Sequence, residues 1–139
     1  MGLNERVEAL ARAVAEREIA HAEALARARA RAQALRERVL PAIESFNRIV
    51  GAASPDLAVS VTPLRTDDKH AHAVEFDLER GRTRAVVTAK SKGQVTLVGP
   101  FRTGKDEGPC RSFAFEADDD IESALVDFVE RFLEAATAP

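Results

Sequence analysis

Apolar residues recur every three or four positions through the first part of the chain. Their average spacing is about 3.6 residues, the period of a straight α-helix. The positions between them are mostly Ala, Arg, Glu and Gln, which are strong helix formers. The pattern predicts one long amphipathic helix with an apolar stripe. The stripe consists of Leu3, Val7, Leu10, Val14, Glu18, His21, Leu25, Ala28, Ala32, Leu35 and Val39.

This stripe predicts an interface with a second copy of the chain. A helix from Asn4 to Leu40 would be roughly 55 Å long, whereas the rest of the chain should form a body with a radius of gyration of roughly 13 Å. An amphipathic helix owes most of its stability to the packing of its apolar face. We therefore expect residues 1–40 to form an oligomerisation stalk, with all stripe positions in the interface, and residues 41–139 to form an α+β body. A homodimer is the expected assembly, with parallel and antiparallel pairing both open.

Pro41 interrupts the helical pattern, which resumes at Ile43 and continues to Val50. The residue before a proline avoids the α region, so we expect a kink near Pro41 and a shorter helix after it, ended by Gly51. Beyond this point the period changes to two, which is typical of strands. The pattern predicts a meander of five antiparallel strands. The first lies in 57–64, the second in 71–79, and the fifth in 110–117.

The predicted turns set a register for the three central strands. A two-residue turn at Arg80-Gly81 would pair Glu79 with Arg82, Asp77 with Arg84, Phe76 with Ala85 and Val74 with Val87. A three-residue turn at 91–93 would pair Val87 with Leu97, Thr88 with Thr96 and Ala89 with Val95. Gly99-Pro100 should end the fourth strand.

A final helix is predicted to begin at the acidic run 118–120 and to pack on the sheet. Its apolar stripe contains Ile121, Leu125, Phe128, Phe132 and either Ala135 or Ala136. The predicted fold class is therefore α+β.

Composition narrows the function classes. Of the 139 residues, 45% are apolar and 31% are charged, as in an ordinary folded protein, and the net charge of −3 gives no general reason to expect nucleic-acid binding. One cysteine excludes an intramolecular disulfide framework and fits a reducing compartment. The N-terminus lacks a signal-peptide pattern, and no apolar run has the length of a membrane span, so we expect a cytoplasmic protein.

A run of arginines accompanies the second half of the stripe. Arg27, Arg31 and Arg38 flank one side of it, and Arg29 and Arg36 flank the other. The first three form a possible contact for an anion such as a nucleic-acid phosphate. The alternative, which we favour, is that these arginines pair with glutamates of a partner helix.

Three other places could carry chemistry, and each has a plainer interpretation. Residues 99–105 have phosphate-loop spacing, but Asp106 stands where a Ser or Thr would hold magnesium. Asp68, His70 and His72 share one strand face and could contact a metal, although His72 should point toward the core. Cys110 stands beside Arg111, which could activate its thiol. We predict no catalytic residue, no metal site and no cofactor, and leave any role of His70, His72 or Cys110 undecided.

The sequence therefore favours a non-enzymatic protein that self-associates through its stalk and presents the body to another protein. The first alternative is an accessory protein that contacts nucleic acid through Arg27, Arg31 and Arg38. The second is a ligand binder or enzyme with a cavity between the sheet and the C-terminal helix.

Overall fold

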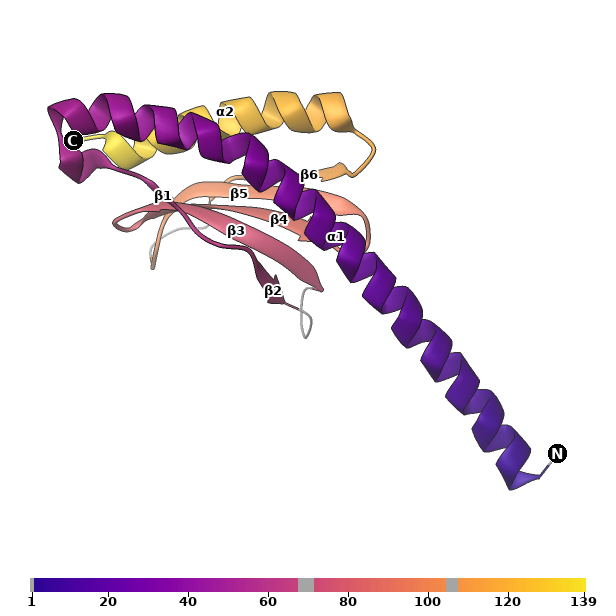
Figure 1. The fold of residues 1–139 in the computed structure, drawn as a ribbon. Coiled ribbons are helices and arrows are strands. Elements are labelled where there is room, and N and C mark those ends of the chain that lie inside the picture. Colours follow the sequence, from indigo (N-terminus) through magenta and orange to yellow (C-terminus); the bar gives the residue numbers. More distant parts are fainter. Residues whose placement is uncertain (1, 68–71, 105–107) are drawn as a thin grey trace.

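The computed structural model describes residues 2–67, 72–104 and 108–139 and has the predicted α+β architecture. Two helices, α1 (Leu3–Ala53) and α2 (Asp118–Thr137), lie over one face of an antiparallel sheet, as Figure 1 shows. The N-terminal part of α1 extends well beyond the edge of the sheet (Figure 1). Neither helix combines the length and apolar character needed to cross a bilayer, judged over the three described ranges.

α1 continues through Pro41 as one helix rather than as two. The expected kink takes the form of a change in helix direction above the sheet (Figure 1). A proline removes the hydrogen bond to the carbonyl four residues earlier. Glu37 and Pro41 are both exposed, so water can reach this carbonyl and the helix need not end. It ends at Ala53, two residues after the predicted stop at Gly51.

The sheet has six strands, of which five lie in a row in the order β1-β3-β4-β5-β6. The strands are β1 (Ser60–Val61), β2 (Arg65–Asp67), β3 (Ala73–Arg80), β4 (Thr83–Lys90), β5 (Gln94–Arg102) and β6 (Cys110–Ala114). Within the first predicted strand, 57–64, only β1 forms, and β2 follows just beyond this range; both strands pair with β3. A short 3-10 turn (Pro55–Leu57) precedes them. Pro63 lies between β1 and β2 and cannot donate a ladder hydrogen bond.

The register between β4 and β5 is the predicted one, with Val87 opposite Leu97 and Thr88 opposite Thr96. The register between β3 and β4 differs by two residues, because the turn consists of Gly81 and Arg82 rather than Arg80 and Gly81. Gly81 has φ of 57°, which suits the first central position of such a hairpin turn. The observed pairs are Glu79/Arg84, Asp77/Val86, Phe76/Val87 and Val74/Ala89. A shift of two residues keeps every side chain on its predicted face.

β5 passes through Gly99 and Pro100 and continues to Arg102, so the prediction that this pair ends the strand was wrong. The pairing with β4 shifts between Arg84 and Val86, which makes room for the irregularity. Gly99 has φ of 112°, and a Cβ at this position would lie 2.9 Å from the carbonyl oxygen of Arg84. Only glycine fits there.

The core lies between the inner face of the sheet and the two helices. The predicted stripe of α2 is buried, with Ala136 rather than Ala135 as its last member. Opposite it are inward side chains of the central strands, and α1 contributes from its second half. The main members are Leu35, Val39, Ile43, Phe76, Leu78, Val87, Leu97, Ile121, Leu125, Phe128 and Phe132.

Candidate interaction surface

The N-terminal part of α1 presents an apolar stripe that the chain itself leaves uncovered. Every residue from Gly2 to Ala20 is exposed. Leu3, Val7, Leu10 and Val14 retain 77%, 54%, 65% and 37% of their accessible surface, respectively. From here on, the name stalk refers to residues 3–20 rather than to the predicted range 1–40. A row of large exposed apolar side chains along one helix face is unusual for a monomeric protein.

The second half of the same stripe is covered by the chain's own sheet. Ala28 and Ala32 are fully buried against Val74 and Ala89 of the sheet, and Leu25 packs beside them. Leu35 and Val39 are 6% and 2% exposed within the main core. These positions were expected in the oligomer interface, but in this structure they pack within the chain's own core. The exposed part of the predicted stripe therefore lies within the stalk, and residue 40 lies within the core-packed part of α1.

His21 and His72 meet where the stalk reaches the sheet. Their rings lie edge to face with centroids 4.7 Å apart. His72 was predicted to point toward the core, but it is exposed, with φ of 46° just before β3 begins. The alternation predicted for β3 holds only from Val74 onward. Glu18 is exposed one turn earlier on the stalk.

The arginine run holds α1 to the rest of the chain. Arg31 forms an ion pair of 2.8 Å with Asp118, and Arg38 pairs with Glu122, so both residues bind the first turns of α2. On the other side, Arg29 donates to the hydroxyl of Thr66, and Arg36 donates to the carbonyl oxygen of Thr62 at 2.9 Å. Arg27 is exposed. Of the three residues proposed as an anion contact, two are thus already paired with carboxylates.

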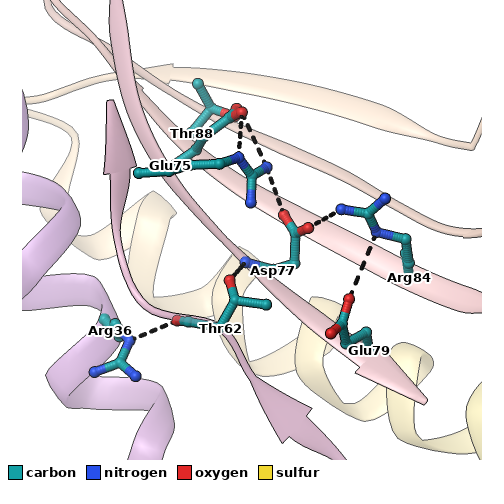
Figure 2. Close-up of polar contacts among 8 residues, drawn as sticks. Arg36, Thr62, Glu75, Asp77, Glu79, Arg84 and Thr88 are labelled. Carbon is teal, nitrogen blue, oxygen red and sulfur yellow. Dashed lines mark hydrogen bonds and ion pairs between the residues drawn. The ribbon is translucent and has the colours of Figure 1, made fainter. Parts of the chain in front are cut away.

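The outer face of the sheet carries a polar network centred on Asp77 (Figure 2). The Asp77 side chain is only 1% exposed, although both described helices lie over the opposite face of the sheet (Figure 1). Its Oδ1 accepts a hydrogen bond of 2.7 Å from Arg65, and its Oδ2 accepts one from Arg84. Arg65 also pairs with Glu75. Burial alone would lower the pKa of Arg65, but the hydrogen bond to Asp77 and the charge of Glu75 raise it above its usual value.

This network holds the segment around Thr62, between β1 and β2, against β3 at the edge of the sheet. The Asp77 backbone N–H donates to the hydroxyl of Thr62 at 2.8 Å, and the Thr62 N–H donates back to the Asp77 carbonyl at 2.9 Å. Arg36 of α1 binds the carbonyl of the same Thr62 (Figure 2). Because the acidic groups are balanced by arginines and held in place, the arrangement is that of a structural ion-pair network rather than of reacting groups.

The other candidates from the sequence gain little from the structure. Asp68, His70, Lys105 and Asp106 lie outside the described residues. Within the described part of the chain, no three His, Cys, Asp or Glu side chains lie close enough together to hold a metal ion. Cys110 is exposed at the start of β6 on the outer face of the sheet.

Among the described residues, two hollows lie between the sheet and α2, a small one beside the middle of the helix and a larger one at its C-terminal end, described further below. The first is too small for a ligand. It lies beside Leu97, Ala124 and Phe128 and measures about 40 Å³, enough for about one water molecule.

One apolar surface went unnoticed in the sequence. Val39, Phe46, Leu125, Val129 and Leu133 line a groove of about 430 Å³ between α1 and α2. Both flanking stripes were recognisable, but their adjacency depends on two helices far apart in the chain.

Comparison with protein-family models, curated proteins and solved structures finds no match for this chain.

Proposed function

We propose that this chain is a non-enzymatic interaction module that self-associates through the stalk, with a second copy as the occupant of the stripe formed by Leu3, Val7, Leu10 and Val14. The observation that carries the proposal is the exposure of these four side chains on one face of a long helix. The same face is buried one turn after another once the helix reaches the sheet. The stalk therefore continues the apolar face of α1, but none of the described residues covers this face.

The burial available sets the strength of the association. A fully buried Val or Leu is worth roughly 1.5–3 kcal/mol, and these four side chains have on the whole about half of their surface still to bury. Two copies together would gain on the order of 10 kcal/mol, while association costs about 4–15 kcal/mol. Leu25, Leu35 and Val39 add nothing to this gain, because the chain covers them itself. The net gain is at most about 6 kcal/mol, so we expect a reversible dimer with a Kd of about 40 µM or weaker.

The fitting experiment compares two substitutions on opposite faces of the stalk. Leu10 and Ile19 are both exposed, and nine residues at about 100° each place them half a turn apart. Leu10→Asp should abolish the concentration-dependent increase in sedimentation coefficient of the full chain. Ile19→Asp introduces the same charge on the far face and should leave it intact. A full chain that stays monomeric up to about 500 µM, or equal effects of the two substitutions, would contradict the proposal.

Nucleic-acid binding through the arginine run has less support. Arg31 and Arg38 are held by Asp118 and Glu122, so neither presents a free charge to a phosphate. Phosphate contacts would also make binding weaken steeply with salt, whereas association through an apolar stripe should not.

A further inference from the structure

A pocket lined by arginines, unlike the apolar groove between the helices, lies at the end of the sheet opposite the stalk. It is formed by the β3–β4 turn, the end of β5 and the end of α2, which come together at that side of the molecule (Figure 1). Its volume is about 530 Å³. Three arginines line it, Arg80, Arg82 and Arg102. Among its described lining residues there is no Asp or Glu, and the one anionic group is the main-chain carboxylate of Pro139.

The charges of these arginines are not neutralised in the way that others in this protein are. Arg31, Arg38, Arg65 and Arg84 all pair with carboxylates. By contrast, no ion pair to Arg80, Arg82 or Arg102 is found within the described part of the chain. Like charges at short range repel one another, and an anion among them would relieve that repulsion.

Arg80 is a fixed cation at one wall of this pocket. Its Nε and Nη2 donate to the carbonyl oxygen of Asp56 at 3.2 and 3.0 Å, and its Nη1 donates to the carbonyl oxygen of Ala136 at 2.7 Å. Carbonyl oxygens orient the guanidinium but leave its full positive charge. The Arg80 side chain, from β3, therefore connects the segment after α1 to the end of α2, and its positive charge faces the pocket.

The guanidinium groups of Arg82 and Arg102 have N–H donors available for a ligand. Arg82 donates one Nη2 hydrogen bond of 3.0 Å, to the carbonyl oxygen of Thr103, and both side chains belong to exposed residues. A guanidinium has five N–H donors in a planar fork that matches the oxygens of a phosphate or carboxylate. The apolar residues Pro100, Phe101 and Ala135 also line the pocket.

We propose that this pocket binds a small organic anion through a phosphate or carboxylate group. Arg82 and Arg102 contact the oxyanion, Arg80 supplies a fixed positive charge, and the apolar lining residues contact the apolar part of the ligand. The site lies far from the stalk and does not depend on self-association.

Isothermal titration of the full chain with inorganic phosphate, phenyl phosphate and benzoate tests this proposal. Phenyl phosphate should bind more tightly than inorganic phosphate, because its ring can pack on the apolar part of the lining. Comparison of phenyl phosphate with benzoate then shows which oxyanion the arginines prefer. No heat of binding with any of the three probes at about 10 mM would overturn the proposal.

Variants localise the binding. Arg82→Gln and Arg102→Gln should each weaken phenyl phosphate binding by about tenfold or more, because each removes a charge-assisted contact. Arg48→Gln, on the exposed surface of α1, is the matched control and should bind like the unchanged chain. Arg80 is not substituted, because its hydrogen bonds to Asp56 and Ala136 also hold the fold together. Since a ligand that binds only the folded state raises Tm, phenyl phosphate should raise the Tm of the Arg48→Gln control but not that of an Arg82→Gln/Arg102→Gln chain. Equal binding by all variants would show a diffuse charge effect and refute the site.

Discussion

Leu10 and Leu35 occupy the same stripe of the same helix, yet the structure assigns them opposite roles. Leu35 is 6% exposed in the core, whereas Leu10 is 65% exposed on the stalk. Replacing each with Ala removes the same atoms and keeps a strong helix former in place. The pair therefore isolates the effect of burial from the effect of helix propensity.

The expected magnitudes differ several-fold. Leu35→Ala leaves a cavity among α1, α2 and the sheet and should lower the free energy of unfolding by about 3–5 kcal/mol. For a domain of this size, each kcal/mol corresponds to roughly 2–4 °C in Tm, so Tm should fall by roughly 6–20 °C. Leu10→Ala should change the free energy of unfolding by no more than about 0.5 kcal/mol, because water already surrounds the side chain.

Urea unfolding of both variants, followed by circular dichroism at a concentration where the chain is monomeric, measures these values. Sedimentation at higher concentration should show the reverse order, with Leu10→Ala weakening self-association and Leu35→Ala leaving it unchanged wherever the chain stays folded. Equal losses of stability would mean that the stalk is buried in the monomer. A large loss in Leu10→Ala alone would refute the packing of α1 described above.

Three further predictions concern the sheet. Asp77→Ala should lower the free energy of unfolding by about 2–3 kcal/mol in urea unfolding, because two charge-assisted hydrogen bonds are lost at a buried carboxylate while the arginines can still reach water. Gly99→Ala should cost at least about 2 kcal/mol, whereas Gly51→Ala, in open space on α1, should stabilise the chain by about 0.5–1 kcal/mol; a similar response of the two glycines would contradict the strand geometry. Because the pKa of Arg65 is raised, its contribution is complete below the unfolded-state pKa and is lost only as the pH rises through the folded-state pKa. Arg65→Gln should therefore cost the same at about pH 6 and about pH 9, and a cost confined to one of these would show that another group controls the network.

The fold was largely predictable because apolar residues recur with different spacings in its helices and in its strands. Alternation along residues 74–78 and 85–89 placed the correct side chains inside, and the spacing of Ile121, Leu125 and Phe128 identified the buried face of α2. The three-residue turn at 91–93 fixed the β4–β5 register, since shifting it by one residue would turn the apolar side chains outward.

The β3–β4 register was not predictable in the same way. The turns Arg80-Gly81 and Gly81-Arg82 both leave the apolar side chains inside, because they differ by two residues in register. Opposite charges also meet in both, with Asp77 opposite Arg84 in the predicted pairing and Glu79 opposite Arg84 in the observed one. Arg84 contacts both acids in the structure, so charge alone does not select a register. The position of the glycine within the turn decides it.

What covers the N-terminal stripe was the main question that periodicity could not answer. A period of 3.6 shows which face of a helix is apolar, but a sheet of the same chain and a helix of a second chain satisfy it equally. The side-chain sizes do contain a signal. Ala28 and Ala32 are small, and their complete burial against Val74 and Ala89 shows the close approach of helix and sheet that small side chains allow.

The stalk has the opposite composition on the same face. Its stripe consists of Leu and Val at positions 3, 7, 10 and 14, with no alanine among them. Large side chains keep a facing backbone at a distance and interdigitate best with side chains of similar length from another helix. The small residues Ala28 and Ala32 lie where α1 packs directly on the sheet, whereas the large residues Leu35 and Val39 fill the wider core shared with α2. Small side chains therefore mark the closest contact with the chain's own sheet, and the absence of alanine from the stalk's stripe is consistent with the second copy proposed for that half.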